Sequence, residues 1–124
     1  MNQNTKIKQN MSSYNQCTFV GNLTADPELR KIGDKATPVL DGSLAVNRVY
    51  KDKEGRKVED VDFIPFTSFG KAAEILAKYL RKGDSVLLSG EMRQDKWEDK
   101  ESGQKRSQLK LRVENFTLLN NKRD

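Results

Sequence analysis

The chain has 124 residues, a length typical of one domain, and 33% of these residues are charged. Lysine and arginine outnumber aspartate and glutamate by 23 to 18, which makes the net charge +5 and the pI about 9.4. A small basic chain favours polyanionic partners, such as nucleic acid or an anionic membrane. Charge that serves solubility alone explains the balance equally well.

The residue types that are missing exclude several kinds of site. The sequence has no histidine and a single cysteine, Cys17, so it can form no Ser/His triad, Cys/His dyad, Cys/His zinc site or intramolecular disulfide. No apolar run reaches the roughly 18 residues of a membrane span, and residues 1–16 lack the apolar centre of a signal peptide. We therefore expect a soluble, cytoplasmic protein that does not enter a membrane.

The N-terminal part divides into a polar lead-in and a strand. Residues 1–15 are rich in Asn, Gln, Ser and Lys, so we expect a flexible segment with too little apolar surface to fold. The first strand is predicted over 17–23, because its apolar residues alternate onto one face. Gly21 inside this strand predicts a bulge or the close approach of another backbone.

A long hairpin is predicted next. Its strands run over 39–50 and 61–69, and the charged residues 51–57 between them include a glycine, which is typical of a hairpin tip. Pro65 in the third strand has no N–H to donate to a neighbouring strand, so it predicts an edge or a bulge at this position.

The third strand carries large apolar side chains on both faces. Phe63 and Phe69 have one parity, and Ile64 and Phe66 have the other. Only one face can line the core of a single small sheet. One of the two pairs is therefore left for another role.

The C-terminal half begins with the one clear helix, predicted over 71–81. Its apolar stripe is Ala72, Ile75, Leu76, Tyr79 and Leu80. A fourth strand is predicted over 85–92 and a fifth over 108–118, joined by a second charged hairpin tip over 94–107. The alternation of the fifth strand shifts at Phe116, which predicts a bulge.

The order of three strands, one helix and two strands predicts an all-β fold with one helix. A five-stranded Greek-key barrel with an α-helix between the third and fourth strands is the OB-fold, although other small barrels with one helix share this order. We expect the folded domain over residues 16–119, followed by a short polar end over 120–124.

Four aromatic residues lie where a core does not require them, namely Tyr50, Phe63, Phe69 and Trp97. Tyr50 ends the second strand, and Trp97 lies in the second hairpin tip among charged neighbours. Bases stack on exposed rings at about 1–3 kcal/mol per base, and the phosphates then need nearby cations. The cations close to these rings in sequence are Arg48, Lys51, Lys53, Arg56, Lys57, Lys71, Arg93, Lys96, Lys105 and Arg106.

Each ring also has a purely structural interpretation. Tyr50 can form a cross-strand pair at the end of its hairpin. Phe63 and Phe69 can pack in a subunit interface or in a second small core. Trp97 can clamp its own hairpin or be buried by a partner subunit, and any single cation is more often a solvated charge than a phosphate ligand. The aromatic and basic residues are more persuasive as a group.

Five short segments follow one another in a characteristic order. They are Phe19-Val20-Gly21-Asn22-Leu23, Asp26-Pro27-Glu28-Leu29-Arg30, Phe69-Gly70-Lys71, Tyr79-Leu80-Arg81-Lys82-Gly83-Asp84, and Gly90-Glu91-Met92-Arg93 leading to Trp97. In this order they resemble the bacterial and phage single-stranded-DNA-binding (SSB) protein family, over roughly residues 16–119. The resemblance implies an OB-fold that stacks the bases of single-stranded DNA on Tyr50, Phe63, Phe69 and Trp97, and a homotetramer, or a dimer, of this domain.

The chain departs from the family pattern in three places. Tyr50 and Phe63 stand where the family usually has tryptophan, so we expect weaker stacking per base. Ile64-Pro65 replaces a polar pair, which bears on local pairing and subunit contacts. Many members continue into a linker and an acidic tip that recruits replication and repair proteins. This chain ends at residues 120–124 without such a tip, as in the short forms of phages, plasmids and DNA-uptake systems, so recruitment through a tail is not expected.

Four functions compete at this point. The first is sequence-tolerant binding and protection of single-stranded DNA during replication, recombination or repair, and the second is an RNA-binding OB-fold domain. The third is a replication-restart accessory protein, whose relatives lack the Phe-Gly-Lys helix and the long charged hairpins. The fourth is a carboxylate-based nuclease using Glu59, Asp60 and Asp62, but no metal-ligand spacing stands out. We expect no enzyme activity, cofactor or metal.

Overall fold

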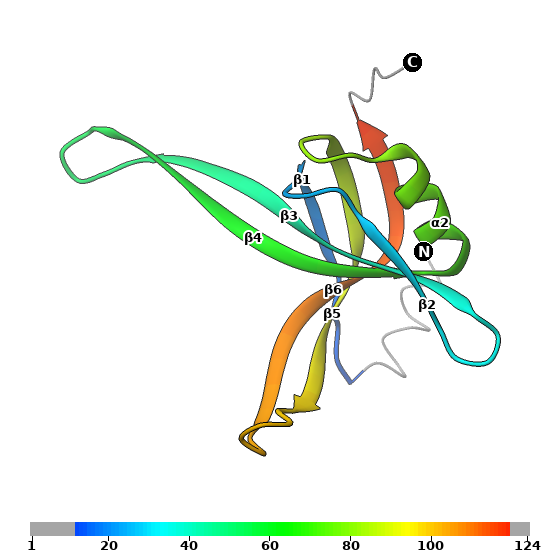
Figure 1. Cartoon of the computed structure of the whole chain (residues 1–124). Helices are drawn as coiled ribbons and strands as arrows, with labels where there is room; N and C mark the ends of the chain where they lie inside the picture. Colours follow the sequence, from blue (N-terminus) through cyan, green and yellow to red (C-terminus); the bar gives the residue numbers. More distant parts are fainter. Residues whose placement is uncertain (1–11, 120–124) are drawn as a thin grey trace.

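The computed structural model describes residues 12–119, which form six strands and one helix (Figure 1). The strands are β1 (Cys17–Leu23), β2 (Glu28–Ile32), β3 (Thr37–Lys51), β4 (Lys57–Phe69), β5 (Ser85–Glu98) and β6 (Lys105–Leu119), and the helix is α2 (Gly70–Tyr79). The expected lead-in lies mostly outside the described residues, as does the expected polar end over 120–124. Asn15, the last residue of the expected lead-in, exchanges hydrogen bonds of 2.6 and 3.0 Å with the backbone of Met92 in β5.

Five of the strands close into a barrel. The sheet order is β1-β5-β6-β4-β3-β2. An additional pairing of β1 with β3 closes the barrel. β4 and β6 run parallel where they meet, and the other pairs are antiparallel. The closed five-stranded barrel with one helix confirms the predicted OB-fold.

The short strand β2 was not predicted from the sequence. All five of its residues are exposed, so it shows no alternation between core and solvent. It forms because its backbone pairs with β3, from Glu28 opposite Asp41 to Ile32 opposite Thr37. Because of this extra strand, the helix follows the fourth strand of the chain rather than the third.

The core is built from one face of each barrel strand and from the inner side of α2. Its largest fully buried side chains are Phe66, Leu40, Leu44, Leu76, Leu80, Leu88 and Leu111. The helix buries Ala73 and Leu76, and it ends at Tyr79, two residues earlier than predicted, because Leu80 takes an extended conformation. A helix of ten residues is too short to cross a membrane, and residues 12–119 contain no other.

Two hairpins extend beyond the barrel as arms, and they point in different directions (Figure 1). The β3–β4 arm comprises residues 46–62, and its strands end at Lys51 and restart at Lys57. The predicted third strand over 61–69 therefore starts four residues too late, because the backbone ladder continues outward through charged residues. The β5–β6 arm comprises residues 93–110, and its turn spans only 99–104. The predicted hairpin tip over 94–107 is therefore too long, because the backbone ladder continues outward through polar residues.

Three local predictions about the strands can be compared with the structure. Pro65 lies opposite Ser43 in unbroken register, and the pairing of β4 with β6 begins only at the next residue, so Pro65 is at an edge. A bulge interrupts β6 near the predicted position, because Asn115 and Val113 face consecutive residues of β5. A Cβ atom at Gly21 would collide with the carbonyl oxygen of Ala45, which confirms the close backbone approach.

Candidate functional site

The four aromatic residues singled out from the sequence are all accessible to solvent. Tyr50 is 47% exposed, Phe63 61%, Phe69 36% and Trp97 46%, whereas Phe66 is 1% exposed. Strand parity therefore assigns Phe66 to the core and leaves the neighbouring phenylalanines outside. Such rings can stack on planar groups without a change in the fold.

The outward side of β4 carries two of these rings. Phe63 and Phe69 share the parity of Thr67, and the intervening Phe66 and Ser68 are buried. Phe69 is the last residue of β4 and the N-cap of α2. Lys71 lies in the first turn of this helix, two residues after Phe69.

The outward sides of β5 and β6 continue the same surface. Thr67 of β4 lies beside Arg112 of β6, and Lys110 shares the parity of Arg112. Across the β5–β6 ladder, Lys110 lies opposite Arg93, and Arg106 lies opposite Trp97. We call this surface the outer face, and it comprises Phe63, Thr67 and Phe69 of β4, Arg93 and Trp97 of β5, and Arg106, Lys110 and Arg112 of β6.

Tyr50 does not belong to the outer face. The β3–β4 register is unbroken, with Ala45 opposite Phe63 and Val58 opposite Tyr50. Because side chains alternate between the two sides of a strand, Tyr50 and Phe63 project from opposite faces of this ribbon. The structure therefore separates one of the four rings from the other three.

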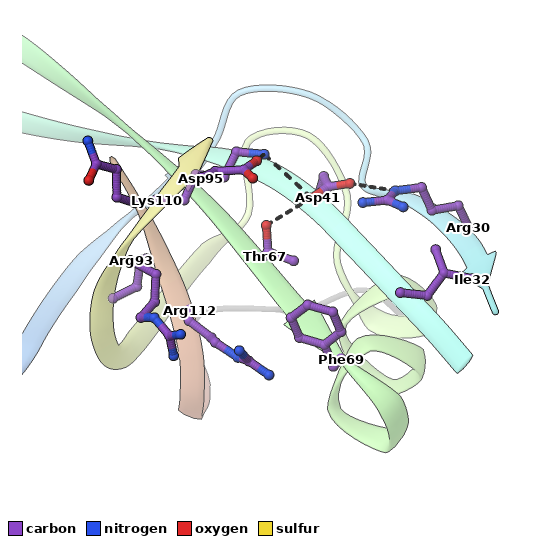
Figure 2. Close-up of a pocket in the computed structure, with 11 residues that line it drawn as sticks. Arg30, Ile32, Asp41, Thr67, Phe69, Arg93, Asp95, Lys110 and Arg112 are labelled. Carbon is purple, nitrogen blue, oxygen red and sulfur yellow. Dashed lines mark hydrogen bonds and ion pairs between the residues drawn. The ribbon is translucent and has the colours of Figure 1, made fainter. Parts of the chain in front are cut away.

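A groove crosses the outer face at the junction of five strands (Figure 2). It has a volume of about 300 Å³ and is lined by Arg30, Ile32, Asp41, Thr67, Phe69, Arg93, Gln94, Asp95, Lys110, Leu111 and Arg112. Four of these residues are cationic and two are acidic. The groove can therefore attract an anion next to an exposed aromatic ring.

Asp41 organises the centre of the groove. Its carboxylate accepts hydrogen bonds from Arg30 Nε at 2.8 Å and from the Thr67 hydroxyl at 2.9 Å. Lys110 Nζ lies 4.0 Å from Asp41 and 3.4 Å from Asp95. Partial burial raises the pKa of Asp41, but the hydrogen bonds from Arg30 and Thr67 and the charges of Arg30 and Lys110 outweigh it, so the pKa lies below 3.8.

The predicted cations fall into two groups. The arginines are held by carboxylates: Arg48 by Asp60 at 2.8 Å and Asp62 at 3.0 Å, Arg56 by Asp52 at 3.3 Å and by Glu54, Arg93 by Glu91 at 2.8 Å, and Arg106 by Asp99 at 3.2 Å. Lys57 is likewise held, by Glu59 at 3.4 Å. Within residues 12–119, no ion pair involves Lys51, Lys53, Lys71, Lys96 or Lys105. Exposed pairs contribute about 0–1 kcal/mol, so an approaching phosphate can replace a carboxylate.

The predicted residues do not form one compact site. Lys51 and Arg56 lie at the tip of the β3–β4 arm, while Lys96 and Lys105 lie near the end of the β5–β6 arm. Figure 1 shows these two arms diverging from the barrel. The site is therefore an extended surface, and the groove occupies its centre.

Trp97 lies in a strand, which corrects its predicted place in a loop. It is the penultimate residue of β5 and lies opposite Arg106. Backbone pairing with β6 fixes its direction, so the ring projects on the side of Arg93 and not at random from a turn. A shallow depression around it is lined by Gln94, Lys96, Trp97, Glu98, Lys105, Arg106 and Ser107.

Three groove cations were not proposed from the sequence: Arg30, Lys110 and Arg112. For Lys110 and Arg112 a signal was present, since they alternate with the buried Leu111 and must face outward. For Arg30 there was none, because β2 was not predicted. Strand parity therefore identifies two of the three groove cations as outward-facing.

Two of the carboxylates considered for a nuclease form ion pairs with an arginine. Asp60 and Asp62 both bind the guanidinium of Arg48, at 2.8 and 3.0 Å. Among residues 12–119, no group of three or more His, Cys, Asp or Glu side chains is arranged to hold a metal ion.

Comparison with known proteins identifies the family of this chain and several of its relatives. Residues 14–119 match the single-strand binding protein family. A single-stranded DNA-binding protein of Helicobacter hepaticus is 38% identical over 109 residues, which cover 88% of this chain and 63% of the relative. Single-stranded DNA-binding protein 1 of Xylella fastidiosa is 36% identical over 115 residues, covering 92% of this chain and 83% of the relative. The chain thus spans less than two thirds of the Helicobacter protein.

The fold is also shared with a solved structure. The crystal structure of a deletion mutant of the single-stranded DNA binding protein from Thermus aquaticus superposes with a TM-score of 0.75 and 28% identity. The superposition covers 88% of this chain and 52% of that one. On the match of nearly all its described residues, the chain belongs to the single-strand binding protein family.

Proposed function

We propose that the protein binds single-stranded DNA with little sequence preference and protects it during replication, recombination or repair, without catalysing a reaction. The observation that carries this proposal is the outer face, on which Phe63, Phe69 and Trp97 are exposed among cations. The names of the relatives support the same ligand. Its place of action is then the cytoplasm, where unwound DNA is exposed.

The physical basis is stacking combined with charge. Each base stacked on an aromatic ring contributes about 1–3 kcal/mol, and every base offers a π-face, so no particular sequence is required. A duplex buries these faces within its own stack. The same surface should therefore discriminate against double-stranded DNA, whose phosphates alone remain available to the cations.

The single tryptophan reports on this surface directly. Trp97 fluorescence should be quenched by oligo(dT), and the quenching should weaken as salt rises, while a duplex of equal length should have little effect. Oligo(rU) of the same length tests the RNA alternative. If the folded protein shows neither quenching nor a gel shift with oligo(dT), the proposal is refuted. Tighter binding to oligo(rU) than to oligo(dT) would identify the protein as an RNA-binding protein instead.

We also propose that this domain assembles into a homotetramer, or at least a dimer, as its family resemblance implies. The apolar pair Val20 and Leu87 supports self-association, because these residues lie opposite each other on the outward side of β1 and β5, and Val20 is 53% exposed. Light scattering coupled to gel filtration tests the assembly. A monomer mass at all concentrations would exclude it.

A further inference from the structure

The ring of Phe69 is covered by a cation. The guanidinium carbon of Arg112 lies 4.6 Å from the ring centroid, a distance typical of a cation–π contact. Figure 2 shows Arg112 extending from β6 toward Phe69 at the edge of the groove. A base cannot stack on this side of the ring while the guanidinium occupies it.

Arg112 differs from the other cations of the groove. Arg30 is held by Asp41, Lys110 by Asp41 and Asp95, and Arg93 by Glu91. Within residues 12–119, Arg112 has no ion pair, and the aromatic ring is the contact that places its guanidinium. It is therefore the groove cation that can move at the lowest cost.

The two sites that the guanidinium can occupy are a ring and a phosphate. A planar guanidinium binds phosphate through two parallel hydrogen bonds, and such charge-assisted bonds are stronger than an exposed cation–π contact. An incoming nucleotide supplies both a base for the ring and a phosphate for the displaced arginine. The exchange leaves neither group without a partner.

We propose that the groove is a subsite for one nucleotide, in which Arg112 leaves Phe69 to bind the phosphate of the nucleotide whose base stacks on that ring. This inference rests on the proposed binding of single-stranded DNA. It makes Arg112 a positioning residue that couples stacking to phosphate binding. It also assigns a purpose to a cation that otherwise obstructs a binding ring.

The first test is the salt dependence of oligo(dT) binding. Removing one phosphate contact lowers the slope of log K against log salt by about 0.7 for a single strand, so the loss of affinity from about 50 to about 200 mM salt should shrink about 2.6-fold. Arg112→Gln should show this change, and Arg112→Lys should keep the wild-type slope because it keeps the charge. Arg112 is exposed, so both variants should retain the thermal stability of the wild type.

The matched control is Lys82→Gln, which makes the same change of charge beyond the far end of α2 from Phe69. It should leave the slope unchanged. A double-mutant cycle with Phe69→Leu gives a second readout: the loss caused by Arg112→Gln should become smaller when the ring is absent, because the nucleotide is then no longer seated. Additive losses would show that the two residues act independently and would overturn the exchange.

The exchange itself is visible by NMR. The ring current of Phe69 should shift the side-chain protons of Arg112 in the free protein, and saturation with oligo(dT) should abolish this shift. A shift that persists in the saturated complex would overturn the proposal. If the wild type fails to bind oligo(dT) at all, the proposed function fails, whereas normal binding with a persistent shift or additive losses removes only the inference.

Discussion

Replacing Asp41 with asparagine removes the carboxylate that holds two cations of the groove. Arg30 donates to it at 2.8 Å, and Lys110 lies 4.0 Å away. Asparagine has nearly the same shape and keeps an oxygen that can accept the hydrogen bond of Thr67. The substitution therefore changes the charge of the groove with little change in its volume.

The expected result is tighter binding of single-stranded DNA with a steeper salt dependence. If Arg30 and Lys110 both reach phosphates, the slope of log K against log salt grows by about 1.4, which is about a sevenfold larger loss of affinity between about 50 and about 200 mM salt. Lys110 keeps Asp95 at 3.4 Å, so the release of Arg30 alone gives half of that change in slope. The folded state should lose no more than about 1 kcal/mol, because the ion pairs are partly exposed.

The assay is fluorescence anisotropy of labelled oligo(dT) at several salt concentrations, with Asp34→Asn as the control. Asp34 is an exposed carboxylate in the turn between β2 and β3, and within residues 12–119 it takes part in no ion pair. A folded Asp41→Asn variant with the slope of Asp34→Asn would refute the idea that Arg30 and Lys110 face the DNA.

The pH dependence of Asp41 gives an independent check of its surroundings. Against the effect of partial burial, the hydrogen bonds from Arg30 and Thr67 and the charges of Arg30 and Lys110 hold its pKa in the folded protein below that of an unfolded aspartate, which is about 3.9. A lowered pKa stabilises the folded state at pH values above the pKa of the unfolded chain. This contribution disappears as the pH falls through the pKa of the folded state. The acid unfolding of Asp41→Asn should therefore be less steep than that of the wild type below about pH 4.

Two further substitutions test the faces of the sheet and the packing of the core. Phe63→Leu should weaken binding of a short oligo(dT) by about 1–3 kcal/mol. Tyr50→Leu should affect only the binding of longer strands, because Tyr50 projects from the opposite face of its ribbon. Equal losses of affinity for the short strand, measured by anisotropy, would contradict this separation. Gly42→Ala should lower the free energy of unfolding by about 1–3 kcal/mol, because the new Cβ would lie 2.5 Å from the Phe66 ring. Urea unfolding measures this change, and an unchanged midpoint would show that the ring moves aside freely.

Much of the fold follows from local patterns in the sequence. Strand β1 was predicted with its observed bounds, and the alternation in β4 separated the buried Phe66 from the exposed Phe63 and Phe69. These predictions succeed because the period of two is a property of any extended chain. The strand that was missed, β2, shows why the rule has a limit: its five residues are all exposed, so only pairing with β3 makes it a strand.

The sequence also predicted which types of residue form the candidate site. Exposed aromatic rings and cations can be recognised by strand parity and by their charged neighbours, as for Trp97. Strand parity even contained the signal for Lys110 and Arg112, which flank the buried Leu111 of β6. Residue type and parity together decide what a side chain can do and whether it faces solvent.

The grouping of those residues was decided by the tertiary structure. The groove joins Arg30, Asp41, Phe69, Arg93 and Arg112 from five different strands. Closure of the barrel through the β1–β3 pairing, and the parallel contact of β4 with β6, bring these strands together. Both contacts join residues far apart in the chain, whose positions relative to one another depend on the register between strands and not on any local pattern. For the same reason, the sequence identified Tyr50 as an exposed ring, but only the register of β3 against β4 placed it on the face opposite Phe63.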